Sequence, residues 1–172
     1  MNVLSSLASR VLAAPAQAAL GLVIAAMSTA LAFQYLGDYS PCALCIIQRL
    51  AMTSVALLLV AARLAPAGAP RNGLALLGGA GALGALLTAL YQGYINIAPG
   101  MSCSAKLMLA INELPTAAWL PEVFLASGDC VLLNPTVFEL AMPYAAAAVD
   151  AALVVLAGLI VRQSRRAQAQ SF

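Results

Sequence analysis

The sequence has no histidine and little charge. Of its 172 residues, 8% are charged and 6% aromatic, whereas 63% are hydrophobic. So little charge excludes an ordinary soluble domain, in which apolar residues make up about half of the chain. Without histidine the chain cannot carry covalent haem on a Cys-x-x-Cys-His motif, and it also lacks the second closely spaced ligand pair of a typical zinc site. We therefore expect a membrane protein whose surroundings are the lipid bilayer, with no nucleic-acid partner.

Four apolar segments are long enough to cross a bilayer, because a spanning helix needs roughly 20 apolar residues at a rise of about 1.5 Å each. They cover about residues 14–36, 44–62, 73–94 and 142–161. The first could also be the apolar core of a cleaved signal peptide, but its uncharged run is longer than such a core. The predicted fold is an all-α membrane protein, in which residues 1–172 form a single domain built as a four-helix transmembrane bundle.

The positions of the basic residues predict the orientation of the bundle. Lysine and arginine in short loops are retained in the cytoplasm. Most basic residues flank the predicted spans on one side, namely Arg10, Arg63, Arg71, Arg162, Arg165 and Arg166. Both termini are therefore predicted to be cytoplasmic, and a short loop (about 37–43) and a longer loop (about 95–141) to face outward with all four cysteines. In a bacterial inner membrane this side is the periplasm, where disulfides form and persist.

The four cysteines form two pairs of different construction. Cys42 and Cys45 make a Cys-x-x-Cys motif directly after Ser40-Pro41. Serine caps helices and proline suits a first helical position, so the second helix is predicted to begin at Cys42. The free N–H groups and the dipole at a helix start favour an anion, which predicts a depressed pKa and a reactive thiol there. Cys103 and Cys130 lie far apart in the longer outer loop, and together the two pairs indicate electron transfer.

Arg49 lies four residues after Cys45 and seven after Cys42, so at about 100° per residue the three side chains share one face of the second helix. An arginine inside a span usually faces protein, water or a ligand. Its guanidinium keeps its proton and offers several donors, which suits a thiolate or the oxygens of a reduced quinone. The alternative is an arginine that extends to the outer head groups and has no chemical role.

Two parts of the chain have more than one interpretation. Residues 107–112 and 119–124 of the longer loop are too apolar for a free loop and too short to span. They are predicted to form an interfacial segment with Trp119 at the head groups, which either anchors the loop or contacts a partner. Asp150 in the last span has either a proton-transfer or a packing role, and the sequence does not decide between them.

Residues 40–49, Ser-Pro-Cys-Ala-Leu-Cys-Ile-Ile-Gln-Arg, resemble the Pro-Cys-x-Leu-Cys-x-x-x-Arg signature of the disulfide bond formation protein B (DsbB) family. Residues 119–130 resemble the second outer loop of that family, and Met142-Pro143 the start of its last helix. The resemblance implies a thiol oxidase that reoxidises the periplasmic thioredoxin-fold oxidase DsbA and passes the electrons to a membrane quinone, ubiquinone or menaquinone.

The resemblance also implies roles for individual residues. A thiolate of the partner would attack Cys103 and displace Cys130, and Cys130 would then engage Cys42. Cys45 would donate electrons to a quinone bound near Arg49. Some family members carry a histidine near the outer end of the third helix, where this chain reads Tyr-Gln-Gly-Tyr at 91–94. Proton transfer at the quinone is therefore left open, with Gln48 and Gln92 as candidates to hydrogen-bond a quinone oxygen.

Two other functions compete with this interpretation. A structural membrane protein with two static disulfides would account for the number of cysteines, but not for a thiol pair at a helix start with an arginine on the same face. A vitamin K epoxide reductase-like enzyme also combines quinone-type chemistry with cysteine pairs in a helical bundle. The position of this Cys-x-x-Cys at the start of the second helix argues against it.

Overall fold

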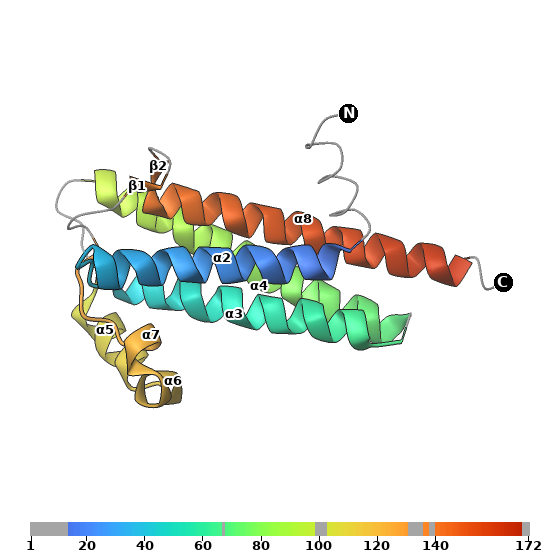
Figure 1. The fold of residues 1–172 in the computed structure, drawn as a ribbon, viewed down its shortest axis with the longest axis horizontal. Coiled ribbons are helices and arrows are strands. Elements are labelled where there is room, and N and C mark those ends of the chain that lie inside the picture. Colours follow the sequence, from blue (N-terminus) through green and yellow to red (C-terminus); the bar gives the residue numbers. More distant parts are fainter. Residues whose placement is uncertain (1–13, 67, 99–102, 131–135, 138–139, 170–172) are drawn as a thin grey trace.

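The computed structural model describes residues 14–66, 68–98, 103–130, 136–137 and 140–169. Four long helices run side by side as one bundle (Figure 1). They are α2 (Pro15–Leu36), α3 (Ala43–Leu64), α4 (Ala69–Ile97) and α8 (Met142–Ala169). Each is long and apolar enough to cross a membrane. The predicted all-α fold with four membrane-spanning helices is confirmed.

The observed helices differ from the predicted spans mainly at their ends. α4 begins at Ala69 and α8 continues to Ala169, several residues beyond the apolar stretches that the sequence marks. A helix can continue past the hydrocarbon layer because its backbone hydrogen bonds are internal. The ends of a helix therefore do not mark the ends of its membrane span, and the predicted bounds of the spans remain predictions. Arg10, which contributes to the orientation prediction, lies outside the described residues.

The proline and glycine in the link between α3 and α4 predict a turn there. Gly68 has a φ of 125°, a backbone conformation that side chains rarely adopt. The Arg71 guanidinium donates to the Ala65 carbonyl from Nε at 3.1 Å and from Nη2 at 2.7 Å. The Gly68 amide donates to Ser164 Oγ at 3.3 Å, which joins this turn to α8.

Small residues let the long helices approach closely. A Cβ added to Gly78 of α4 would lie 2.9 Å from the Leu59 side chain, and one added to Gly81 would lie 3.1 Å from Val55. Ala75 and Ala82 on the same helix are fully buried. In a bilayer such close contact supplies much of the attraction between helices, because lipid tails solvate leucine as well as protein does. The alanine-rich composition therefore serves helix packing.

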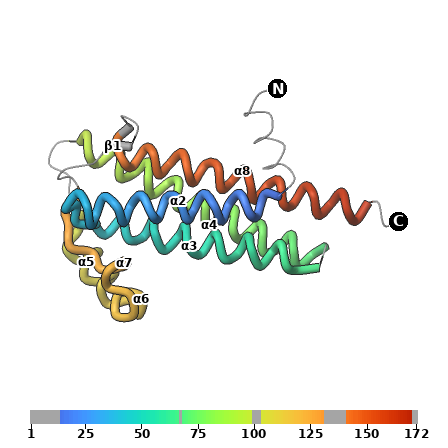
Figure 2. The backbone as a smooth tube through the Cα atoms, in the orientation of Figure 1, coloured from blue at the N-terminus to red at the C-terminus, as the bar shows by residue number. Residues whose placement is uncertain are grey.

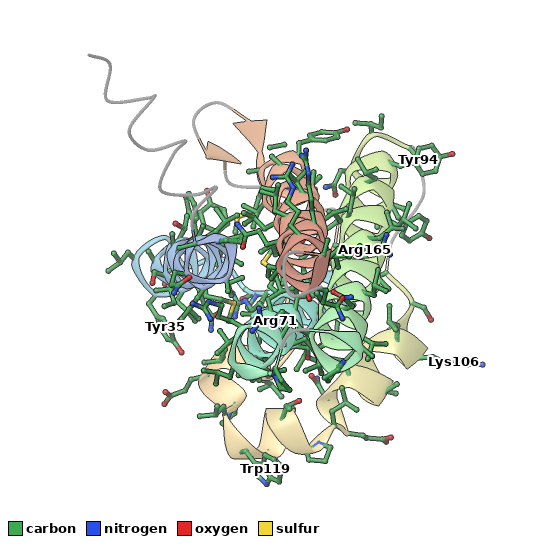
Figure 3. All side chains as sticks on the ribbon, turned by 90° about the vertical axis from the view of Figure 1, so that its right-hand side faces the viewer. Tyr35, Arg71, Tyr94, Lys106, Trp119 and Arg165 are labelled. Carbon is green, nitrogen blue, oxygen red and sulfur yellow. A yellow bond between two sulfur atoms is a disulfide. The ribbon has the colours of Figure 1, made fainter. Side chains whose placement is uncertain are left out.

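In the described part of the longer loop between α4 and α8, three short helices lie beside one end of the bundle, where α2 ends and α3 begins (Figure 2). They are α5 (Ala105–Asn112), α6 (Pro115–Trp119) and α7 (Pro121–Phe124), and two short strands, β1 (Thr136–Val137) and β2 (Leu140–Ala141), pair just before α8. The Asn112 side chain exchanges two hydrogen bonds with the Ala126 backbone, at 2.9 and 2.8 Å. Trp119 is 77% exposed and points away from the bundle (Figure 3), in the part of the loop predicted to be interfacial.

Candidate functional site

The Cys42–Cys45 pair lies at the start of α3. Cys42 is the N-cap residue rather than the first residue of the helix, and its Sγ accepts a hydrogen bond from the Cys45 amide at 3.3 Å. The two sulfur atoms are 2.8 Å apart and share a further hydrogen bond. Both thiols are free, Cys42 being 2% exposed and Cys45 half-buried. This geometry suits reversible formation of a disulfide.

The predicted depression of the Cys42 pKa is wrong. The hydrogen bond to the Cys45 thiol and the burial of the sulfur raise the pKa of Cys42 above its ordinary value. The helix start does supply backbone donors, but two neighbouring thiols resist ionising together, and burial disfavours a charged sulfur. The sequence revealed the helix start and not the depth of burial.

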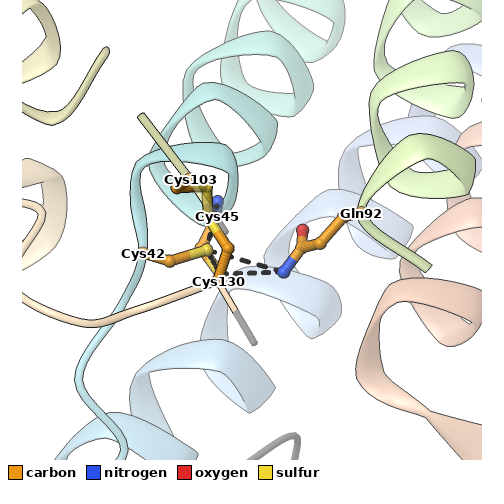
Figure 4. Close-up of a disulfide and its surroundings, with 5 residues drawn as sticks. All are labelled: Cys42, Cys45, Gln92, Cys103 and Cys130. Atoms are coloured by element: carbon orange, nitrogen blue, oxygen red, sulfur yellow. Dashed lines mark hydrogen bonds between the residues drawn. A yellow bond between two sulfur atoms is a disulfide. The ribbon is translucent and has the colours of Figure 1, made fainter. Parts of the chain in front are cut away.

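The second pair is a disulfide between Cys103 and Cys130, whose Cα atoms are 5.5 Å apart. It packs with Cys42 and Cys45 in one cluster, so all four cysteines of the chain meet at one place (Figure 4). Cys130 is 2% exposed, whereas Cys103 is half-buried. A molecule approaching from solvent therefore reaches Cys103 more easily than Cys130.

Backbone hydrogen bonds attach the disulfide-bearing loop to the start of α3. The amides of Ser127 and Gly128 both donate to the Pro41 carbonyl at 3.0 Å. A side chain at position 128 would collide with the Ser40 carbonyl, so this contact requires glycine. The loop therefore ends beside the Cys-x-x-Cys motif because of two hydrogen bonds and one steric requirement.

Gln92 of α4 faces the thiol pair. Its Nε2 donates to Cys42 Sγ at 3.5 Å and to Cys45 Sγ at 3.4 Å (Figure 4). The residue is 5% exposed. The sequence suggested Gln92 as a partner of a quinone oxygen but gave no sign of its contact with the sulfurs. A polar side chain in an apolar span was the available signal, since such groups seek partners inside the protein.

Arg49 is buried, at 6% exposure, and does not extend to the surface. Its Nη1 donates to Gln34 Oε1 at 2.8 Å and to the Val123 carbonyl at 2.7 Å, and its Nη2 lies 3.5 Å from the Ala30 carbonyl. Gln34 also donates to the Glu122 carbonyl at 2.9 Å. The guanidinium thus joins α2, α3 and α7. Gln34 was not identified from the sequence, although it too is a polar residue in an apolar span.

A cavity of about 280 Å³ opens beside the thiol pair, between α2, α3 and α8. Most of its lining is apolar, from residues such as Leu22, Phe33 and Val149. Cys42, Cys45, Gln48, Arg49 and Gln92 supply polar groups to its wall. A few polar groups in an apolar cavity are typical of a small-molecule site. The described residues contain no group of cysteine, aspartate and glutamate side chains able to hold a metal ion.

Comparison with known proteins identifies relatives of this chain. The family described as disulfide bond formation protein DsbB matches residues 13–160. The chain is 36% identical over 129 residues to "Disulfide bond formation protein B" of Burkholderia thailandensis, which covers 72% of this chain and 75% of that protein. It is 36% identical over 135 residues to "Disulfide bond formation protein B 2" of Burkholderia lata, covering 77% and 79%. The corresponding protein of Ralstonia nicotianae is 34% identical over 116 residues, covering 66% and 71%.

Replacing Gln92 with leucine is expected to slow alkylation of the reduced Cys42–Cys45 pair. Loss of the amide donor removes a hydrogen bond that stabilises the thiolate, which lowers the fraction of ionised sulfur. The more basic thiolate is also more nucleophilic, which offsets part of this loss. We therefore expect the alkylation rate to fall about threefold. The rate is measured with iodoacetamide in a Cys103→Ser, Cys130→Ser background. Thr88→Val on the same helix, which removes only a hydroxyl bonded to the Gly84 carbonyl, is the matched control. Equal rates in the two variants would contradict a role for Gln92 at the sulfurs.

Proposed function

Because the chain belongs to the disulfide bond formation protein DsbB family, we propose that it is a quinone-dependent thiol oxidase of the bacterial inner membrane. Its protein substrate would be a DsbA-like periplasmic oxidase of the thioredoxin fold, and the product of the pathway would be disulfide bonds in periplasmic proteins. One observation carries the proposal: a free thiol pair lies between a disulfide and an apolar cavity inside the helix bundle. Thiols in that position can take electrons from outside and release them inside the membrane.

The cavity is the proposed quinone site, with ubiquinone as the first candidate and menaquinone as the second. Its volume of about 280 Å³ and its apolar lining suit a quinone ring. A quinone supplies a two-electron, two-proton acceptor when bound. Cys45 lines this cavity and would deliver the electrons, while Arg49 would orient the ring by donating to an oxygen. Arg49 carries a fixed positive charge, so it would also stabilise negative charge that develops on sulfur or oxygen.

The exposure of the sulfur atoms supports a proposed order of thiol exchange. A thiolate of the partner would attack Cys103, the half-buried sulfur, and form a mixed disulfide while Cys130 leaves as a thiolate. The second partner thiol would then release the partner in its oxidised form. In the state in which Cys42 and Cys45 are disulfide-bonded, Cys130 of the same cluster would attack Cys42 and release Cys45 as a thiolate. Cys103 would then displace Cys42 from Cys130, which re-forms the Cys103–Cys130 disulfide and leaves the Cys42–Cys45 pair reduced, the state in this structure. Reoxidation of Cys42 and Cys45 to a disulfide would release two electrons and two protons, which a bound quinone would accept.

The proposed orientation places both termini in the cytoplasm. All four cysteines gather near one end of the bundle, where the short helices of the outer loop also lie (Figure 1). The end of α3, the start of α4 and the last turns of α8 lie toward the other end (Figure 1). These segments carry Arg63, Arg71, Arg165 and Arg166. Basic residues are retained in the cytoplasm, which favours the periplasm for the cysteine end.

The purified protein should convert a ubiquinone analogue to its quinol when a reduced thioredoxin-fold oxidase is added. The ultraviolet absorbance of the quinone measures this conversion. Cys45→Ser should abolish this conversion, because the remaining Cys42 thiol has no partner with which to form a disulfide. Thr53→Val on the same helix removes only a hydroxyl bonded to the Arg49 carbonyl and serves as the folding-matched comparison. Turnover in the Cys45 variant at the wild-type rate would refute the proposed function.

In intact bacteria, Cys130→Ser should accumulate a mixed disulfide between Cys103 and a periplasmic oxidase, visible on a non-reducing gel. In this variant the Cys103 thiolate would attack the disulfide of the oxidised periplasmic oxidase, one sulfur of which leaves as a thiolate, and no internal thiol remains to displace the partner. Cys103→Ser should give no such adduct. Because the trapped partner is periplasmic, the same gel tests the orientation. An adduct formed only by the Cys103→Ser variant would reverse the assigned order.

Arg49→Ala should raise the apparent KM for the ubiquinone analogue by about tenfold or more, since hydrogen bonds to charged groups contribute about 1.5–3 kcal/mol. The KM for the protein substrate should change less than twofold. Gln34→Leu removes one acceptor of the guanidinium and leaves its charge, so it separates the loss of the helix contact from the loss of the cation. Equal effects on both substrates would remove Arg49 from the quinone site.

A further inference from the structure

A hollow strip runs along the last turns of α8, at the end of the bundle away from the cysteines (Figure 1). Its lining residues follow the spacing of one face of an α-helix. They are Gly158, Val161, Arg162, Arg165, Arg166 and Ala169. A Cβ added to Gly158 would meet no atom of the described residues within 4 Å, so the strip is open at its apolar end. The strip therefore begins with apolar residues and continues with three exposed arginines.

The three arginines lie far from the acidic residues that the structure describes. The nearest along α8 is Asp150, which precedes Arg162 by about 18 Å along the helix axis, at a rise of about 1.5 Å per residue. The others lie at the cysteine end, namely Asp38, Glu113, Glu122 and Asp129. Like charges three or four residues apart on a helix repel each other. The dipole at the end of α8 offsets part of this repulsion, and an anion bound between the arginines would remove the rest.

The strip crosses the level at which the hydrocarbon layer ends. The apolar stretch of α8 extends to Val161, and the arginines follow it by about 1.5 to 7.5 Å along the helix axis. The head-group layer on each side of a bilayer is about 5–7 Å thick, so the guanidinium groups lie at the depth of the lipid phosphates. Gly158 and Val161, together with Val155 at 62% exposure, lie at the depth of the acyl chains.

We propose that this strip binds one anionic phospholipid, whose phosphate accepts hydrogen bonds from the arginines and whose acyl chain lies over Gly158 and Val161. Guanidinium groups suit this role because their planar set of N–H donors matches the oxygens of a phosphate. Basic pockets at the membrane surface bind anionic head groups in the same way. The site is separate from the cavity beside the thiols, and the inference does not depend on the proposed function.

Charge argues against two other occupants of the strip. Residues 1–13 contain Arg10 and no acidic residue, so that segment cannot neutralise the arginines. A second copy of the chain in the same membrane and the same orientation would bring its own arginines to this level and its acids to the opposite one. A free phosphate supplies the negative charge but no apolar part for Gly158 and Val161. An anionic lipid supplies both.

The test measures lipid binding to delipidated protein in detergent by native mass spectrometry. The wild-type protein should bind one phosphatidylglycerol at least about tenfold more tightly than a phosphatidylcholine with the same acyl chains. The triple variant Arg162→Gln, Arg165→Gln, Arg166→Gln should lose this preference. Inorganic phosphate at the same concentration should not displace the lipid, because it makes no contact with the apolar end of the strip.

Gly158→Leu tests the strip without changing its charge. The leucine side chain would occupy the space of the acyl chain, which should weaken phosphatidylglycerol binding about threefold. Gly84→Leu on α4 is the matched control, because a Cβ at position 84 also meets no described atom within 4 Å and no arginine follows it on that helix. Binding by the Gly84 variant should equal that of the wild-type protein.

Several results would overturn the inference. Equal binding of phosphatidylglycerol and phosphatidylcholine would show that the strip does not select an anionic lipid, and a preference that survives in the triple variant would place the lipid elsewhere. Displacement by inorganic phosphate would assign the arginines to a free anion. Equal binding by the Gly158 and Gly84 variants would show attraction to charge without a defined site. If thermal unfolding shows that the triple variant does not fold, the comparison of the two glycine variants decides the matter.

Discussion

The position of the second sulfur pair depends on the Pro41 carbonyl, which accepts the amides of Ser127 and Gly128 immediately before α3. These two bonds join a loop that is remote in sequence to the residue preceding Cys42. They explain why the Cys103–Cys130 disulfide packs on the Cys-x-x-Cys motif instead of lying elsewhere above the bundle. Thiol exchange requires contact between sulfurs, so any function that links the two pairs depends on this attachment.

The bilayer imposes a second constraint, because polar groups in a span must find partners inside the protein. Arg49 bonds to α2 and α7, Gln92 to the thiol pair, and Gln48 to α4 and Asp150. Each of these bonds joins different segments, so the polar residues hold the helices together around the cavity. The same groups that satisfy each other inside the membrane also supply the polar groups of the site, so structural and functional roles coincide at the end of the bundle that carries the cysteines.

The sequence predicted the features that depend on composition and local spacing. Apolar length predicted four helices, and the Ser-Pro before Cys42 predicted the start of α3 to within one residue. The motif placed Cys42, Cys45 and Arg49 on one face, and all three line the cavity. The predicted pKa of Cys42 was wrong because it depends on burial and on a second thiol in contact, which spacing alone does not reveal. The family match also argues against the vitamin K epoxide reductase-like alternative.

The pairings of Gln34 with Arg49 and of Gln48 with Asp150 could not be read from the sequence, since each joins positions far apart in the chain. What the sequence does show is that the spans contain few polar residues, and that those few must meet. Asp150 illustrates the limit: the sequence offered a proton or a packing role, and the structure places its carboxylate against an amide whose other end faces no donor.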